Sequence, residues 1–479
     1  MIYLEDEQAT ERLGADLSRA LGPGDVVYLH GDLGAGKTTL ARGFIRALTG
    51  ETDIPSPTFG LVQAYKGAVH ADLYRLREAP EAEEVALYEA SGGAVVLVEW
   101  PSHGEGFIPD PTLEIRLEDE GDGRRATLSG PAMAGVERSL LIRDFLRAND
   151  LTEAAREHLT GDASTRSYEV LDLPERPIVM NAPRAPDGPP IRDGKPYSRI
   201  AHLAEDVAPF VAVAQALVEQ GFAAPRVRAS DLDQGLLLID NLGAGSVLEN
   251  GQPVADRYLA SAEALAAMHA KTWPREIDLG DRRHIVPDYD RDAMQVEVSL
   301  LADWYAPDVL GRSLDARERA EFERLWDALI EDVNESEPTL VLRDFHSPNI
   351  IWRDEQTGTD RVGLIDFQDA VMGPRAYDVA SLAQDARVDM SEELEERIVR
   401  RYLEASGTPE ALFRRDYAIL AAQRASKILG IFVRLDVRDG KPGYRAHLPR
   451  LRDYIGRTLR HPHLAELAGF YAKAFRLGA

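Results

Sequence analysis

Two short stretches of the chain carry side chains whose types and spacing suit chemistry on phosphate groups. In "RDFHSPN" (343–349), Asp344 stands five positions before Asn349, and Asp366 ends an apolar stretch further along. Such an aspartate can orient an acceptor hydroxyl and take its proton, while the asparagine and second aspartate hold Mg²⁺ against the phosphates. The pattern predicts phosphoryl transfer to a hydroxyl, with Asp344 as the base and Asn349 and Asp366 as metal ligands. The plainer alternative is a turn cap and a strand end.

The other stretch, "GDLGAGKT" (31–38), fits G-x-x-x-x-G-K-[ST] between a strand pattern at 25–30 and a helical pattern at 37–50. Its glycines let backbone N–H groups curl around phosphate oxygens, and the helix N-terminus adds positive potential. Lys37 is placed to reach the β- and γ-phosphates, and the Thr38 hydroxyl can ligate Mg²⁺. An ordinary Gly-rich turn needs neither side chain, so the pattern predicts a nucleotide-binding loop.

Composition limits what the rest of the chain can do. The formal net charge is −26, from 55 basic and 81 acidic residues, which argues against non-specific binding to nucleic acid or to an anionic membrane. The chain has no cysteine, so disulfides, thiolate metal sites and a cysteine nucleophile are excluded. The first twenty residues are acidic and amphipathic, and no apolar run approaches membrane length, so we expect a cytoplasmic protein without membrane contact.

The elements that must position these residues fall into two parts. In residues 1–132, strand and helix patterns alternate, which predicts a three-layer α/β domain of P-loop type. A break near 130–135 precedes the second part, 136–479. There a strand-rich lobe (about 160–243) is followed by a helical lobe (about 250–479), the outline of a bilobal, protein-kinase-like α+β fold. The main expected helices are 7–21, 37–50, 136–150 and 204–221, and the main expected strands are 93–100, 111–131, 167–173, 176–181 and 361–366.

Three further motifs follow the nucleotide loop in order: "SPTF" (56–59), "HADLYRL" (70–76) and "VEWP" (98–101). With the loop, they resemble TsaE, a small bacterial ATPase that supports threonylcarbamoyl modification of adenosine 37 in tRNA. The resemblance covers about residues 1–130. It implies ATP as ligand, and the proteins TsaB and TsaD as partners.

The TsaE resemblance also implies roles for individual residues. Glu99 joins Thr38 as an organiser of Mg²⁺, and Asp72 lies near the metal or the attacking water, unless it caps a turn. Trp100 packs either on a substrate or partner or in the core. The residues implied to contact ATP are Glu7, Leu33, Gly34, Ala35, Gly36, Lys37, Thr38 and Arg124.

The second part resembles the aminoglycoside phosphotransferase and choline kinase superfamily through "D-F-H-x-x-N" and "I-D-F-x-D-A". More narrowly it resembles AmgK, an anomeric kinase that makes the 1-phosphates of N-acetylmuramic acid and N-acetylglucosamine in cell-wall recycling. The segments that carry this likeness are "GDASTRSYEVL" (161–171), "VMNAP" (179–183), "LLLIDNLG" (236–243) and "YDRDAMQVEVSLLADWY" (289–305). An amino sugar is therefore the implied substrate, with ATP and Mg²⁺.

This likeness also has departures. Protein kinases carry a lysine on the third strand, where this chain has Met180 or Asn181, so the cation that contacts the phosphates is left open. Arg166 is a candidate for it, with a plain surface arginine as the alternative. The expected adenine-binding hinge residues are Asp240, Asn241 and Leu242, and the candidate sugar contacts, which core packing explains equally well, are Glu297, Trp304 and Tyr305.

Three alternatives stay open at this point. The kinase could act on another hydroxyl acceptor, such as an aminoglycoside, a choline-like amine or a fructosamine. The first part could be a nucleotide-dependent interaction module rather than an active ATPase. The second part could be a degenerate scaffold, although retention of Asp344, Asn349 and Asp366 speaks against that.

Overall fold

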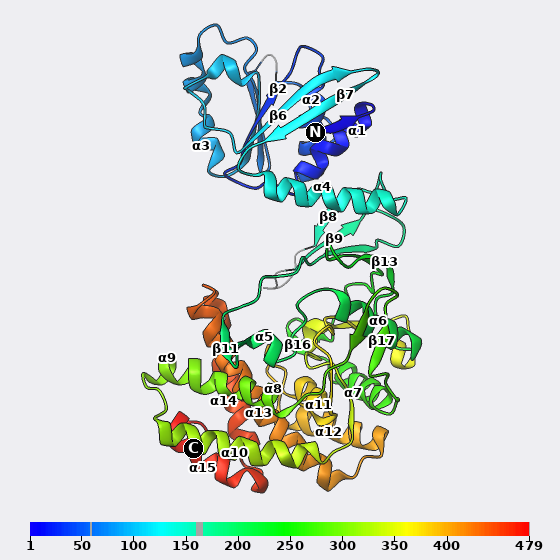
Figure 1. Ribbon diagram of the computed structural model, residues 1–479, viewed down its shortest axis with the longest axis vertical. Helices are drawn as coiled ribbons and strands as arrows, with labels where there is room; N and C mark the ends of the chain where they lie inside the picture. Colours follow the sequence, from blue (N-terminus) through cyan, green and yellow to red (C-terminus); the bar gives the residue numbers. More distant parts are fainter. Residues whose placement is uncertain (58–59, 160–165, 479) are drawn as a thin grey trace. The chain divides into compact units, whose positions relative to one another are not determined.

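The computed structural model describes residues 1–57, 60–159 and 166–478. The chain divides into two compact units, Met1–Asn181 (the N-terminal unit) and Ala182–Ala479 (the C-terminal unit) (Figure 1). The division falls inside the strand-rich segment predicted for 160–243. The last two residues of "SPTF" and residues 161–165 of "GDASTRSYEVL" lie outside the described residues.

The N-terminal unit is built on a seven-stranded sheet in the order β1-β7-β6-β2-β5-β4-β3. β2 pairs in parallel with β5 and β6, and β5 also pairs in parallel with β4, so that the carboxyl ends of these strands meet at one edge. The strands are β1 (Ile2–Leu4), β2 (Val26–His30), β3 (Val62–Tyr65), β4 (Ala68–Asp72), β5 (Val95–Glu99), β6 (Leu113–Glu120) and β7 (Gly123–Ser129).

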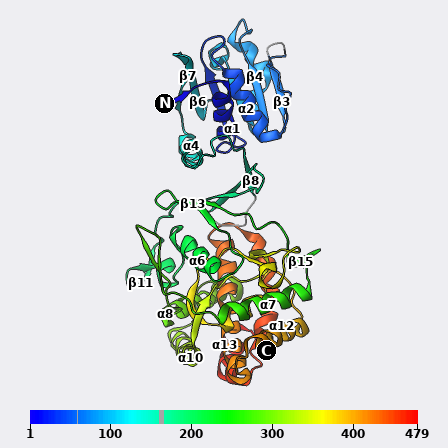
Figure 2. The ribbon, with the colours of Figure 1, turned by 90° about the vertical axis from the view of Figure 1, so that its right-hand side faces the viewer.

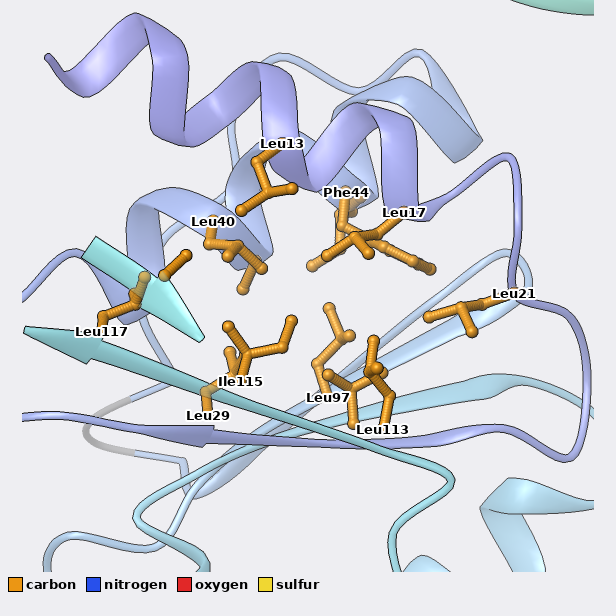
Figure 3. Close-up of a cluster of buried hydrophobic side chains, with 14 of the residues drawn as sticks. Leu13, Leu17, Leu21, Leu29, Leu40, Phe44, Leu97, Leu113, Ile115 and Leu117 are labelled. Atoms are coloured by element: carbon orange, nitrogen blue, oxygen red, sulfur yellow. The ribbon is translucent and has the colours of Figure 1, made fainter. Parts of the chain in front are cut away.

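Helices cover both faces of this sheet. On one face α1 (Glu7–Leu17) and α2 (Lys37–Thr49) place Leu13 and Phe44 over the strands that carry Leu97 and Ile115 (Figure 3). The two helices pack closely because a Cβ on Gly43 would lie 2.1 Å from the carbonyl oxygen of Glu11. α3 (Leu87–Ser91) contributes to the core of the opposite face. The three-layer α/β domain predicted from the sequence is confirmed.

The N-terminal unit continues through α4 (Met133–Ala148) into β8 (Arg156–Leu159), β9 (Ser167–Leu171) and β10 (Ile178–Asn181), which pair antiparallel in series. A buried ion network ties these elements to α1. Asp16 accepts hydrogen bonds from Arg143 at 2.8 Å and from Arg156 at 2.9 Å, and Arg156 also binds Glu169 at 2.7 Å. The network therefore holds α1, α4 and the β8–β9 pair together.

The C-terminal unit is mostly helical, as predicted. Its strands form short antiparallel pairs: β11 (Pro190–Arg192) with β12 (Lys195–Pro196), β13 (Val227–Asp231) with β14 (Leu236–Ile239), β15 (Leu248–Glu249) with β16 (Gln252–Pro253), β17 (Glu276–Asp278) with β18 (Arg283–Ile285), β19 (Pro338–Val341) with β22 (Val371–Pro374), and β20 (Ile350–Trp352) with β21 (Val362–Leu364). The helices are α5 (Tyr197–Ile200), α6 (Ala208–Glu219), α7 (Ala255–His269), α8 (Arg291–Leu300), α9 (Ala306–Leu310), α10 (Ala316–Asn334), α11 (Ala376–Ala383), α12 (Glu392–Ser406), α13 (Glu410–Val437), α14 (Leu448–Thr458) and α15 (Ala465–Phe475).

The long helix α13 is the centre of this unit. It packs against α8, α10, α11 and α14, among the green-to-red helices of Figure 2. Most of its middle is buried on every side, as expected of a helix in the core of a large lobe. The helix α8 changes at its end into a π-helical turn, Leu301–Tyr305. None of the helices in the described ranges is long and apolar enough to cross a membrane.

Candidate active sites

The nucleotide loop joins β2 to α2 in the N-terminal unit. Gly34 and Gly36 have φ of 87° and 98°, a conformation that favours glycine and turns the backbone around the loop. The Lys37 ammonium donates to the carbonyls of Gly31 at 2.7 Å and Asp32 at 2.8 Å. Burial lowers the pKa of Lys37, and nearby carboxylates, that of Glu99 foremost, partly offset this effect. The loop thus holds a cation at its centre.

Two carboxylates meet this loop at the ends of neighbouring strands. Asp72 and Glu99 are paired across β4 and β5, and both are buried. The Thr38 hydroxyl donates to Glu99 Oε1 at 2.8 Å, so the two predicted metal-organising residues are in contact. His70 Nε2 lies 2.9 Å from the same oxygen. Sequence reasoning passed over His70, although it opens the "HADLYRL" motif.

The remaining predicted ATP contacts surround the loop. A Cβ on Gly36 would lie 3.2 Å from the Arg124 guanidinium, which places this arginine directly beside the loop. Glu7 lies in the first turn of α1 and faces Arg42 of α2 at 3.5 Å. Leu33 is 79% exposed at the loop tip. The structure therefore brings Arg124 to the loop, while Leu33 is exposed and Glu7 pairs with Arg42.

Trp100 belongs to the site rather than to the core. Its backbone has φ of 56°, an uncommon conformation for a bulky residue, directly after β5. The Lys37 ammonium lies 3.9 Å from the centre of its ring, and the Tyr74 ring lies 4.9 Å away. The indole thus covers the lysine that the loop holds.

In the C-terminal unit, the catalytic loop follows β19 and brings the three predicted residues together. Asn349 Nδ2 donates to the Asp344 carbonyl at 2.9 Å and lies 3.3 Å from Asp366 Oδ2. The pairing of β20 with β21 sets this spacing, because Ile350 pairs with Leu364 and so brings Asn349, just before β20, beside Asp366, just after β21. Asp366 has φ of 59°, a strained conformation of the kind that gathers at functional sites.

Two buried aspartates accept hydrogen bonds from backbone N–H groups of the catalytic loop. Asp378 accepts hydrogen bonds from the backbone N–H groups of Leu342 at 2.7 Å and Arg343 at 2.9 Å. Asp385 does the same for the N–H of Ser347 at 2.8 Å. Asp378, from α11, thus braces the start of the catalytic loop. Asp385 was missed, since an aspartate in "SLAQDAR" has no spacing that marks it.

A buried cluster of charges lies beside the base. Glu297 pairs with Arg343 and, at 2.8 Å, with Lys427 of α13. Burial would raise the pKa of Glu297, but these two cations outweigh it and hold that pKa at about 2. Burial likewise opposes the ionised form of Asp344, and neighbouring cations, Lys427 foremost, still lower its pKa. Asp344 is therefore a carboxylate base in an electropositive setting.

Of the predicted sugar contacts, Glu297 belongs to this cluster. Glu297 is fully buried and Tyr305 is 1% exposed, whereas Trp304 is half-buried in the π-helical turn. Arg452 lies over the Tyr305 ring at 5.5 Å. This placement favours the packing alternative for Glu297 and Tyr305.

Comparison with known proteins decides the family. Residues 156–418, more than half of the chain, match the family described as "Phosphotransferase enzyme family". The chain belongs to this phosphotransferase family. Residues 4–127 match a second family, "Threonylcarbamoyl adenosine biosynthesis protein TsaE". The predicted fusion of a TsaE domain with a phosphotransferase is confirmed.

Relatives of both parts are known. A protein of Caulobacter vibrioides named N-acetylmuramate/N-acetylglucosamine kinase is 37% identical over 352 residues, covering 70% of this chain and 96% of that relative. One of the same name from Pseudomonas aeruginosa is 32% identical, covering 65% of this chain and 86% of its own. A Rickettsia felis protein, tRNA threonylcarbamoyladenosine biosynthesis protein TsaE, is 37% identical over its full length and 36% of this chain.

In this phosphotransferase, the predicted hinge follows β14. Arg228 Nε donates to Asp240 Oδ1 at 2.6 Å, and Asn241 Oδ1 accepts from the N–H of Gly243 at 2.9 Å. The Leu242 side chain lies 3.2 Å from where a Cβ on Gly363 would stand. These contacts fix the turn after β14, and leave the adenine-binding role of its backbone a prediction.

The residues around the missing strand lysine lie in the N-terminal unit. Asn181 Oδ1 accepts from Arg138 Nε of α4 at 2.8 Å, and Asn181 Nδ2 donates to Ser167 at 2.9 Å. Met180 is buried. Arg166 directly precedes β9. An arginine of α4, which sequence reasoning did not single out, thus contacts the position where protein kinases carry lysine.

The phosphotransferase also has a cavity of about 410 Å³ beside the segment that follows Asp366. Residues of α5, α6 and β18 line it together with Gln368, whose Nε2 donates to Asp366 Oδ1 at 3.0 Å. Asp344 and Asp366 themselves are not part of its lining. The cavity is therefore next to the metal-ligand segment and separate from the base.

Proposed function

We propose that the C-terminal unit transfers the γ-phosphoryl group of ATP to the anomeric hydroxyl of N-acetylmuramate and N-acetylglucosamine, producing their 1-phosphates. The observation that carries this proposal is that Asn349 contacts both the Asp344 backbone carbonyl and the Asp366 carboxylate, so the three residues lie together. The names of the two kinase relatives support the choice of amino sugars.

In the proposed reaction, the Asp344 carboxylate accepts the proton of the acceptor hydroxyl. The hydroxyl oxygen forms a bond to the γ-phosphorus, and the bond from that phosphorus to the bridging oxygen breaks, its electron pair leaving with ADP. Lys427 keeps Asp344 ionised for this step. Asp378 keeps the backbone that carries it in place.

The residues present in both sites fit Mg²⁺, which prefers oxygen ligands. Asn349 and Asp366 offer an amide and a carboxylate oxygen in the phosphotransferase site, and Thr38 and Glu99 offer a hydroxyl and a carboxylate at the nucleotide loop. When bound, Mg²⁺ neutralises charge on the phosphates. The oxygen-rich donor set supports this metal over softer ones.

For the N-terminal TsaE domain, we propose ATP binding and hydrolysis at the loop, with Asp72 near the attacking water and TsaB and TsaD as partners in tRNA threonylcarbamoyladenosine formation. The contact of Thr38 with Glu99 supports this role. We place the functional boundary between residues 132 and 136, at the start of α4. Both proposed reactions consume ATP, so we place the protein in the cytoplasm.

Product identification tests the kinase proposal. The full chain is incubated with ATP, Mg²⁺ and, in turn, N-acetylmuramate, N-acetylglucosamine, an aminoglycoside, choline and a fructosamine, and the products are examined by ³¹P NMR. We expect an anomeric phosphate with the two amino sugars. A phosphate ester on another acceptor, with neither amino sugar phosphorylated, would favour that alternative.

A pull-down tests the TsaE proposal. Tagged full-length protein is mixed with TsaB and TsaD with and without ATP, using Lys37→Ala as the matched variant. We expect capture of the partners that depends on ATP and on Lys37. ATP hydrolysis is measured in the same mixtures. Hydrolysis that stays at background even with TsaB and TsaD present would favour the interaction module over an active ATPase.

A further inference from the structure

Arg434 of α13 is a half-buried cation in the C-terminal unit, and no carboxylate of the described residues pairs with it. Its guanidinium lies 5.0 Å from the centre of the Tyr197 ring. Its Nε is buried and has no hydrogen-bond partner among residues 1–57, 60–159 and 166–478. Asp439, an acid whose charge acts on it, pairs with Arg438 at 2.6 Å. A buried guanidinium nitrogen without a partner is costly, so this partly buried cation favours binding an anionic ligand.

The position of Arg434 relates it to the base. Lys427 lies seven residues earlier on α13, which is about two helical turns, so the two cations share one face roughly 10 Å apart along the axis. Lys427 binds Glu297 at 2.8 Å, and its charge acts on Asp344. Arg434 thus lies on the helix face that carries Lys427, about two turns from the cluster around Asp344.

Tyr197 of α5 contacts Arg434 and feels the charge of both cations. Burial raises the pKa of Tyr197 to about 12, Glu297 adds to this, and the charges of Lys427 and Arg434 oppose it. The tyrosine is therefore close to both ends of the face. Its ring holds the Arg434 guanidinium by a cation–π contact, which limits the directions in which the guanidinium can bind a ligand.

We propose that Arg434, held by Tyr197, is the subsite for an anionic substituent of the acceptor, so that a carboxylate-bearing amino sugar is preferred to its neutral counterpart. A guanidinium binds a carboxylate with two parallel hydrogen bonds, which gives strength and direction. N-acetylmuramate carries such a carboxylate and N-acetylglucosamine does not. The inference rests on the proposed kinase function and adds the group that selects between its two acceptors.

The test is a comparison of kcat/KM for the two sugars in the full chain. Arg434→Gln is expected to lower kcat/KM for N-acetylmuramate about 10- to 100-fold, mainly through KM, and to leave N-acetylglucosamine within about twofold. Arg434→Lys should retain part of the preference. The matched control is Arg438→Gln, at the C-cap of α13 and paired with Asp439, which should leave the rates with both sugars unchanged.

A neutral form of the substrate tests whether the carboxylate is the group that Arg434 binds. Wild type should treat the methyl ester of N-acetylmuramate as Arg434→Gln treats the acid, since either change removes the same ion pair. The thermal midpoint of Arg434→Gln should equal or exceed that of wild type, because an unpaired cation is removed. Equal loss for both sugars, or an unchanged preference, would overturn the subsite. A wild type inactive toward both sugars would overturn the proposed function as well.

Discussion

The two candidate ATP sites of this chain are held together in different ways. At the nucleotide loop, the groups that matter are backbone atoms of 31–38 and the side chains of two adjacent strand ends, in direct contact with one another. Around Asp344, the supporting groups come from α8, α11 and α13, distant in sequence and buried. The proposed phosphate contacts of the nucleotide loop come from a local turn of the backbone. The loop that carries Asp344, in contrast, is held in place by side chains from distant parts of the sequence.

The largest predicted effect comes from removing the carboxylate base of the kinase site while leaving the nucleotide loop intact. Asp344→Asn keeps the size of the side chain and loses the proton acceptor, so we expect kcat for sugar phosphorylation to fall about 10³- to 10⁴-fold. The thermal midpoint should change little. Steady-state rates with N-acetylglucosamine measure the effect, and nucleotide binding at the loop of the same variant serves as the control. A loss below tenfold would mean that Asp344 is not the base.

The second prediction concerns the joint between the two families' segments in the N-terminal unit. Asp16→Asn leaves Arg143 and Arg156 without their buried partner, so we expect a loss of about 3 kcal/mol in the free energy of unfolding of that unit. Urea denaturation measures it. Asp144→Asn, from an exposed pair with Arg147 on α4, is the matched control and should show no measurable change. If Asp16→Asn and Asp144→Asn were equally stable, the buried ion network would not stabilise the N-terminal unit.

Much of both sites could be predicted from the sequence, because the residues that do chemistry stand in short motifs. The loop 31–38, Asp72 and Glu99 meet because parallel strands end at one edge. Asp344, Asn349 and Asp366 meet because β20 and β21 pair. The outline of each fold followed from alternating strand and helix patterns and from the long helical region.

What the sequence did not reveal depends on distant contacts. Glu297 looked available for a sugar, but its two cationic partners lie 46 and 130 positions away in the chain, and no spacing announces them. His70 and Asp385 act on residues far along the chain, and Arg138 contacts Asn181 43 positions on. The π-helical turn after α8 likewise depends on packing against α13 rather than on local propensity.

The third prediction changes the nucleotide loop instead of the kinase site. Lys37→Ala removes the cation held by Gly31 and Asp32, so we expect nucleotide affinity at the loop to fall about 100-fold. Sugar phosphorylation should stay within about twofold of wild type. A fluorescent ATP analogue measures binding, in an Asp366→Asn background that weakens the second site. Loss of sugar phosphorylation in Lys37→Ala itself would mean that the two sites are one functional system.

The smallest predicted effect concerns Glu297, whose buried charge contributes to the stability of the region around the catalytic loop. The pKa of Glu297 is lowered from 4.5 to about 2, so its stabilising contribution is complete above pH 4.5 and is lost as the pH falls toward 2. Between pH 6 and pH 3.5, the stability difference between wild type and Glu297→Gln should shrink by about 1 kcal/mol. Urea denaturation at both pH values measures it.

Glu263→Gln is the control for this pH effect. Glu263 forms an exposed pair with Arg401, so the stability of this variant should differ little from that of wild type at both pH values. A pH-independent difference for Glu297→Gln as well would contradict an ionised Glu297 as the partner of Arg343 and Lys427.

The central claim is that one chain carries two separate sites for ATP. Equilibrium dialysis with a non-hydrolysable ATP analogue and Mg²⁺ tests it most directly, by counting bound nucleotide per chain. We predict two molecules for wild type, and one each for Lys37→Ala and Asp366→Asn at a concentration that saturates only the intact site. A single molecule bound to wild type, lost in either variant, would contradict the account.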